Sequence, residues 1–188
     1  MATELELVNA ALLRVGSETI TAGEFATPLE ERAVAVDAFW PIARRSVLRE
    51  HPWNAVTKRD TLTVDGTAPE WDYTTRFAVP ANTLRILNVN VTGPWRVEAG
   101  YILCDEADDL EIVFIEDDND PSAFDSMLTE ALILKLAIML CERITDSSTK
   151  RERLLDEYQQ VMRDVKHIEG QEKSENEFEE DLWITARY

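Results

Sequence analysis

The 188-residue sequence is poor in the residues that most often build catalytic and ligand sites. It contains two histidines, two cysteines and six glycines. Neither His51 nor His167 belongs to a pair with the spacing of a zinc protease, and neither stands beside a cysteine that it could activate as a nucleophile. Six glycines leave few places for a backbone loop that cradles a phosphate. The sequence therefore predicts that the protein is not an enzyme and has no catalytic residue, cofactor site or metal site.

Basic residues are also scarce. The chain has 19 Lys and Arg against 37 Asp and Glu, a formal charge of −18 and a pI near 4.4. General affinity for nucleic acid depends on cationic side chains that neutralise phosphates, so this balance disfavours it. An acidic surface repels DNA or attracts basic partners. No secretory signal opens the chain, so we expect Cys104 and Cys141 to be reduced core residues.

One long apolar run stands out against this acidic background. Residues 124–144 read FDSMLTEALILKLAIMLCERI, and between positions 131 and 141 only Lys135 is polar. A membrane span needs about 20 apolar residues, so this interrupted run with charged flanks predicts no membrane insertion. A helix that is apolar on nearly all sides needs protein neighbours around it. We expect it to be the central helix of a bundle, with a subunit interface as the alternative cover for its remaining apolar surface.

Three further helices are predicted around it. Thr3 and Glu6 form a capping box that starts the first helix, and Gly16 ends it. Thr27 is expected to cap the second helix, with Pro28 in its first turn and Pro52 after its end. One apolar face of that helix comprises Leu29, Ala33, Val36, Trp40, Ala43 and Val47, and Pro41 is expected to kink it. The last helix carries Leu154, Tyr158, Val161, Val165 and Ile168 on one face and is expected to end at Gly170.

Between these helices the pattern changes to short β-type runs. They cover residues 58–64, 73–79, 84–91, 95–99, 101–105 and 110–115, separated by turn-forming clusters. Hairpin spacing predicts an antiparallel sheet. The fold class is therefore α+β: a four-helix bundle (1–54 and 121–170) interrupted by an antiparallel β-rich insertion (55–120) and followed by an extended, flexible acidic tail (171–188).

Two charged groups invite a functional interpretation. The acids at 116–120 lack the glycine and closing glutamate of a calcium loop, so we expect Asp120 to cap the central helix instead. Arg44, Arg45 and Arg49 form a basic cluster in an acidic chain. They are either a solvated face paired with Glu30, Glu31 or Asp37, or a contact with an acidic neighbour such as another copy of the protein.

The tail contains large apolar residues, which a disordered segment usually lacks. Phe178, Leu182, Trp183, Ile184 and Tyr188 either fold back on the bundle or anchor a partner, since buried aromatics often dominate binding energy.

Several short motifs, taken in order, resemble one known family. They are VNAALLRVGSE (8–18), WPIAR (40–44), LREHPWN (48–54), WDY (71–73), FAVP (77–80), LRIL (84–87) and LWITAR (182–187). In this combination the chain resembles the head-to-tail adaptor, or connector, proteins of tailed bacteriophages, in particular the tail tubular protein A family of short-tailed phages. One departure is Ala55-Val56, where the family pattern has an aromatic residue followed by alanine.

The resemblance implies a virion structural protein of the phage neck, assembled in the host cytoplasm. Such adaptors form a ring, typically of twelve copies, that connects the portal to the tail proteins and lets DNA pass without specific binding. It also implies portal docking by the tail and structural roles for Trp53 and Tyr73. The docking residues would be Phe178, Leu182, Trp183, Ile184, Arg187 and Tyr188, and the inter-subunit candidates Arg44, Arg45 and Arg49.

Two alternatives stay open at this point. An acidic DNA mimic, or decoy, would bind a basic protein as a monomer or dimer. A hydrolase using a metal at residues 116–120 would be stabilised by that metal.

Overall fold

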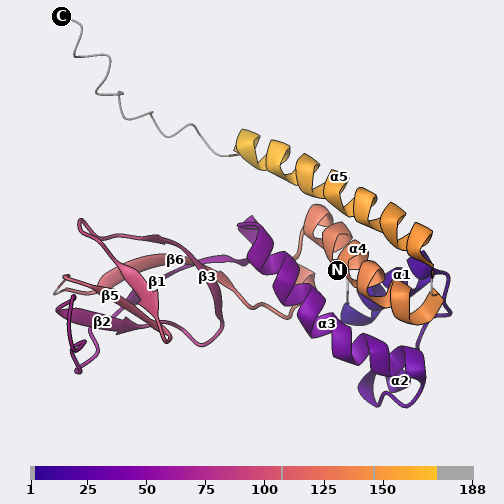
Figure 1. Cartoon of the computed structure of the whole chain (residues 1–188), viewed down its shortest axis with the longest axis horizontal. Helices are drawn as coiled ribbons and strands as arrows, with labels where there is room; N and C mark the ends of the chain where they lie inside the picture. The colour runs from indigo at the N-terminus through magenta and orange to yellow at the C-terminus, as the bar shows by residue number, and fades with distance from the viewer. Residues whose placement is uncertain (1–2, 107, 146, 173–188) are drawn as a thin grey trace, which may run out of the picture.

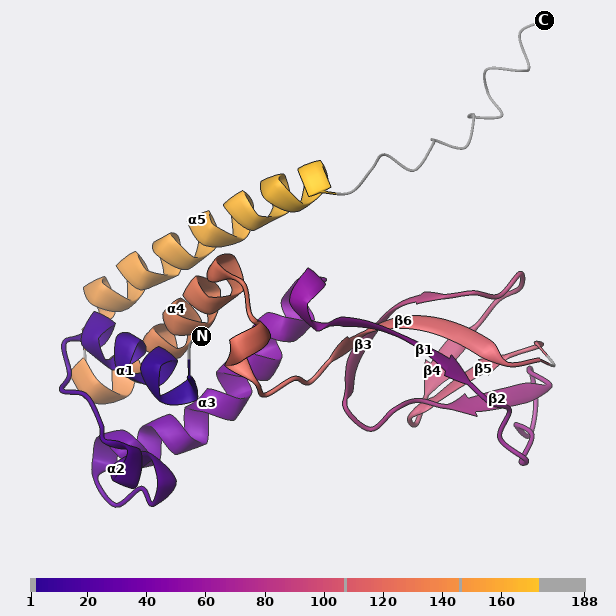
Figure 2. The same ribbon diagram turned by 180° about the vertical axis from the view of Figure 1, so that it is seen from behind.

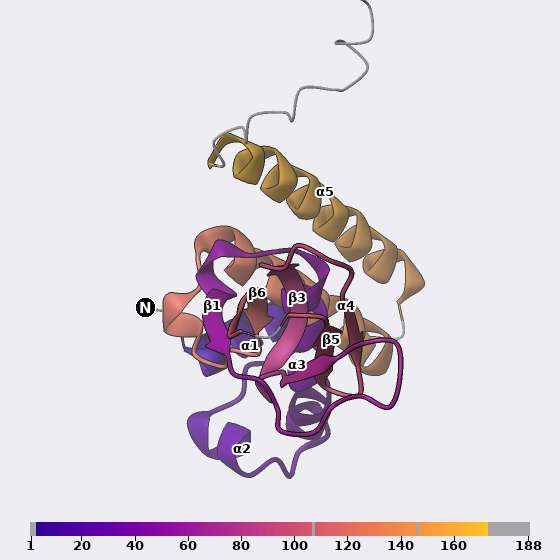
Figure 3. The ribbon, with the colours of Figure 1, turned by 90° about the vertical axis from the view of Figure 1, so that its left-hand side faces the viewer.

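The protein is a mixed α+β chain whose helices gather at one end and whose strands project from the other (Figure 1). The computed structural model describes residues 3–106, 108–145 and 147–172. Seen from behind, the chain passes from the end of α3 directly towards β1 (Figure 2). Viewed from the β end, the strands lie in front of α1 and α3, whereas α5 lies to one side (Figure 3).

The described residues form five α-helices: α1 (Glu4–Val15), α2 (Ala22–Ala26), α3 (Glu31–Glu50), α4 (Ser126–Thr145) and α5 (Ser148–Glu172). Two short 3-10 helices, η1 (Asn54–Val56) and η2 (Pro121–Ala123), flank the strands. The strands are β1 (Thr57–Leu62), β2 (Thr75–Ala78), β3 (Thr83–Val89), β4 (Arg96–Glu98), β5 (Tyr101–Cys104) and β6 (Leu110–Glu116).

Helix α4 lies at the centre of the helical part, as its apolar run predicts. It packs against α1, α3 and α5, and every residue from 131 to 141 is buried or half-buried. The chain itself therefore covers most of this stretch of α4. Lys135 is accommodated because its Nζ lies over the Tyr158 ring, 5.1 Å from the centroid, and 4.0 Å from the Glu50 carboxylate.

Tyr158 completes this link between three helices. Its hydroxyl donates a 2.6 Å hydrogen bond to Glu50. Burial and the neighbouring carboxylate both disfavour the phenolate, so the pKa of Tyr158 is raised and the hydroxyl stays a donor.

The first helix follows its sequence signals. Thr3 and Glu6 form the capping box, and Gly16 ends α1 at a φ of 82°. Asn9 then fixes the following loop, because its amide donates to the Ile20 carbonyl at 2.9 Å and accepts from the Ile20 N–H at 2.8 Å.

The predicted start of the next helix is wrong. Thr21 and Glu24 form a capping box for α2, which the sequence patterns missed, and Thr27 ends that helix instead of starting one. Helix α3 begins at Glu31, leaving Leu29 outside it and 86% exposed. The other five predicted face residues are buried, α3 continues through Pro41, and it ends before Pro52 as expected.

Two predicted helix ends also need correction. Asp120 caps η2, whereas α4 starts after Asp125, whose carboxylate accepts 2.8 Å hydrogen bonds from the N–H groups of Met127 and Leu128. Helix α5 runs through Gly170 to Glu172. A single glycine costs a helix only about 1 kcal/mol, which does not by itself end it.

All six predicted strands form, and all named pairs are antiparallel. They make two three-stranded sheets, ordered β1-β6-β3 and β2-β5-β4, instead of one sheet of successive hairpins. Only β4 and β5 are both adjacent in sequence and paired. The two sheets share a second core that includes Phe77, Ile102, Cys104, Ile112 and Phe114. Burial of these side chains between the sheets decides which strands pair, because it brings together strands that are far apart in the sequence.

The turn between β4 and β5 provides a stability test. Ala99 and Gly100 have φ angles of 48° and 82°, the backbone of a two-residue hairpin that favours Asn-Gly. Ala99→Asn should relieve the strained alanine and raise the free energy of unfolding by about 0.5–1 kcal/mol in urea denaturation. The matched control is Ala81→Asn in another turn, where we expect a change within about 0.5 kcal/mol. Equal effects of both substitutions would contradict the assignment of strain to Ala99.

Candidate functional site

The arginines of α3 lie where the helices meet the strands. The Asp117 carboxylate, just after β6, accepts from Arg44 Nη2 at 2.9 Å and from Arg45 Nε at 2.8 Å. Arg44 Nη1 also lies 3.8 Å from Glu4 on α1. Arg49 donates to the backbone carbonyl of Leu84 on β3. All three arginines therefore make contacts within their own chain.

The partner of Arg44 and Arg45 differs from the one expected on α3 itself. Sequence spacing suggested Glu30, Glu31 or Asp37 as the partner. The observed partner is Asp117, which lies 73 positions after Arg44 and 72 positions after Arg45. Glu31 pairs instead with Arg143 on α4, at 2.8 Å. Arg44 is buried by these contacts, whereas Arg45 keeps an exposed side chain. Of the three arginines, Arg45 and Arg49 are thus the ones that a neighbouring molecule can reach.

Asp117 is held ionised by this geometry. Partial burial opposes its ionisation, but hydrogen bonds from Arg45 and Arg44 and their positive charges outweigh it, so the pKa of Asp117 lies below its ordinary value of 3.8. Asp117 therefore stays an anchor for both guanidinium groups at neutral pH and joins α3 to the end of β6.

A continuous stripe on the outer side of α3 is the strongest candidate for an interaction surface. Val34, Ala38 and Ile42 recur every fourth residue, and Arg45 and Arg49 continue the same face. Val34 is 49% exposed and Ile42 is 56% exposed. We call these five residues the α3 stripe. The sequence pattern indicated its basic half but not its apolar half, although both follow from the 3.6-residue period once the buried face is known.

The docking residues predicted from the sequence are not among the residues that the structure describes. Phe178, Leu182, Trp183, Ile184, Arg187 and Tyr188 lie outside the described residues. Of the two residues given structural roles, Trp53 is buried and its indole N–H donates to the Val47 carbonyl at 2.9 Å. Tyr73 is half-buried in the loop before β2.

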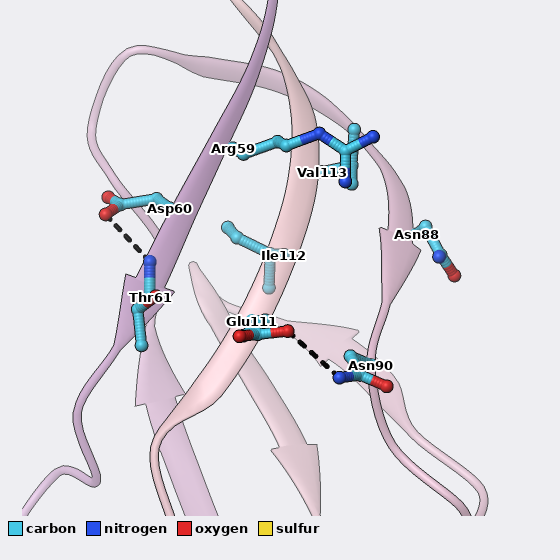
Figure 4. Close-up of a pocket in the computed structure, with 8 residues that line it drawn as sticks. All are labelled: Arg59, Asp60, Thr61, Asn88, Asn90, Glu111, Ile112 and Val113. Carbon is cyan, nitrogen blue, oxygen red and sulfur yellow. Dashed lines mark hydrogen bonds between the residues drawn. The ribbon is translucent and has the colours of Figure 1, made fainter.

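The outer face of the β1-β6-β3 sheet carries a groove of about 570 Å³ (Figure 4). Its two carboxylates are each engaged in a local hydrogen bond. Asp60 accepts from the Thr61 N–H on its own strand, and Glu111 accepts from the Asn90 amide at 3.0 Å. The two carboxylates thus bond to different strands and do not form an acid–base pair with each other.

One aromatic side chain at the far end of the strands is unusually accessible. Trp71 is 76% exposed, and the next residue, Asp72, has a φ of 68°. The Tyr73 N–H donates to the Trp71 carbonyl at 2.9 Å, which closes a tight three-residue turn around Asp72. Such a turn presents Trp71 to solvent as a second contact candidate.

In the part of the chain that the structure describes, no three His, Cys, Asp or Glu side chains cluster closely enough to hold a metal ion. Among these same residues, no helix combines the length and apolarity required to cross a bilayer.

Comparison of the chain with protein-family models and with curated protein sequences finds no match. Functional assignment therefore depends on the surfaces described above and on the motif resemblance.

The Asp117 junction generates a pH-dependent prediction. Asp117→Asn removes a charge-assisted partner from buried Arg44 and should lower the free energy of unfolding at pH 7 by about 2–3 kcal/mol. Because the folded-state pKa is depressed, this contribution is fully present above the unfolded value of 3.8 and is lost as pH falls through the lower folded value.

Urea denaturation at pH 7 and at acidic pH measures this effect. The unfolding free energies of the wild type and of Asp117→Asn should converge at acidic pH. Asp156→Asn on exposed α5 is the matched control and should differ little from the wild type at either pH. A difference for Asp117→Asn that is the same at both pH values would disprove the linkage.

Proposed function

We propose that the protein is a head-to-tail adaptor of a tailed bacteriophage, a ring-forming connector between the portal and the tail. The single observation that carries the proposal is the α3 stripe, whose exposed Val34 and Ile42 continue into Arg45 and Arg49. On a chain with a net charge of −18, this basic and apolar face is complementary to the rest of the molecule's own surface. A second copy is therefore a suitable partner for it.

Such an interface is heterologous, which means that two different surfaces of the protein meet. A face with arginines needs a face with carboxylates opposite it, not the same arginine face of the second copy. Head-to-tail contacts of this kind close into a ring when the rotation between neighbouring copies is a whole-number fraction of 360°. The motif resemblance supports a twelvefold ring. In each copy, the helices would form a four-helix bundle built on α4. These bundles would make the wall of the ring, and the β strands would project from the wall.

The charge of the chain suits a channel for the genome. A lumen lined with carboxylates repels the phosphate backbone, so DNA passes without binding. The same charge supports the alternative of an acidic decoy for a basic protein. The α3 stripe favours the adaptor, because a decoy has no need of an exposed apolar row that bears arginines.

The resemblance further supports docking of residues 178–188 on the portal, contact with the tail proteins on the other side, and location in the phage neck after assembly in the host cytoplasm. Aromatic and aliphatic side chains in this segment would supply the apolar contacts of docking.

The α3 stripe can be tested by Ile42→Glu. Ile42 is exposed, so the fold should be unaffected, but loss of its burial at the interface costs about 2 kcal/mol, or roughly a thirty-fold weaker contact. Native mass spectrometry, with and without the portal, should show rings for the wild type and free subunits for the variant. Val97→Glu on β4, also exposed, is the matched control and should keep the ring. A small wild-type monomer or dimer in both conditions would instead favour the decoy.

Portal docking can be tested by truncation after Glu172, the last residue of α5. The truncated chain should retain its helical circular dichroism spectrum while losing most of its affinity for portal rings in a co-sedimentation assay. Retained affinity after truncation would remove residues 178–188 from the docking site.

A further inference from the structure

A groove of about 330 Å³ opens where the end of α3, the start of α4 and the end of α5 meet. Its apolar lining comprises Trp53, Met127, Val165 and Ile168, and its polar lining comprises His51, Asn54, Asp125 and Ser126. The combination of an apolar lining with a few polar groups is typical of sites that bind a side chain or a small ligand.

The groove follows from a difference in helix length. Helices α4 and α5 are joined by a short turn, and α5 has 25 residues against 20 in α4. The last turns of α5 therefore extend past the start of α4 (Figure 2). Ile168 lies at this level on the packed face of α5 and is 41% exposed, because the first residues of α4 cover it only in part. Val165, one turn earlier, is buried.

We propose that this groove binds residues 182–188 of the same chain, LWITARY. The segment offers a Trp and aliphatic side chains that can pack on the exposed surface of Ile168 and Met127. It also contains one basic residue, Arg187, to complement the Asp125 carboxylate at the edge. A bulky aromatic side chain buries about 150–250 Å² of surface, which suits a cavity of this size.

The chain between α5 and the segment is long enough to turn back. Ten residues separate Glu172 from Trp183, and an extended chain spans up to about 3.5 Å per residue, so the reach exceeds 30 Å. Tethering by such a short linker raises the effective concentration of the segment to about the millimolar range. Weak contacts therefore suffice to keep the groove occupied within one chain.

This interaction goes beyond the adaptor proposal and does not depend on it. In an adaptor, the groove would hold residues 182–188 until the portal competes for them. In any other setting, the segment would cover the exposed end of the α5 apolar face.

Disulfide trapping in the full-length protein tests the proposal. Ser126→Cys lies at the edge of the groove, and Thr185→Cys lies within the segment. The matched control pairs Thr185→Cys with Lys166→Cys, which is two residues from Ile168 but on the opposite face of α5, because successive helical residues are about 100° apart. If the segment did not bind the groove, the tether would let Thr185→Cys meet both positions at similar rates. The native Cys104 and Cys141 are buried and serve as internal non-reacting thiols.

Under mild oxidation of the dilute protein without portal, the Ser126→Cys pair should form an intramolecular disulfide about ten-fold faster than the control pair, equivalent to about 1.4 kcal/mol of preference. Adding Ile168→Glu should reduce this rate to that of the control, with circular dichroism melting to verify the fold. Equal rates for the two pairs, disulfides only between chains, or a rate unaffected by Ile168→Glu would each overturn the proposal. None of these outcomes bears on ring formation or portal binding.

Discussion

A helix that is apolar on every side has to be surrounded, and α4 imposes this requirement on the whole helical part. Helices α1, α3 and α5 each place an apolar face on it. The one lysine in its middle is accepted because Glu50 and Tyr158 come from two of these neighbours. Since α4 uses one face of each surrounding helix, the opposite faces become the surface of the molecule.

Polar contacts between elements add to the apolar packing around α4. Asp117 receives two arginines from α3 and so holds the end of β6 against the helices. Arg49 reaches the backbone of β3 nearby. Arg14 pairs with Glu130 and Glu157 and links α1 to α4 and α5. Arg45 and Arg49 make these contacts and still remain exposed, so they stay accessible on the surface of the molecule.

Local signals predicted which elements exist, and long-range contacts decided how they are arranged. The Thr3 capping box and all six β-type runs depend on neighbouring residues, so they were readable. Thr21 and Thr27 each stand three residues before a glutamate, and only the folded chain shows that the first of them caps a helix. Strand order was not readable, because a shared core selects partners regardless of their separation in the chain.

The sequence by itself determined the α+β class, the central position of α4, the acidic character and the basic cluster of α3, since each follows from composition or from a period of two or 3.6 residues. Only the tertiary structure decided that Asp117 is the partner of Arg44, that Val34 and Ile42 share an exposed face with Arg45, and that α5 extends past α4 to leave Ile168 partly uncovered. The reason is physical: a local pattern specifies which side of a helix is apolar, but packing of distant segments specifies which part of that side is covered.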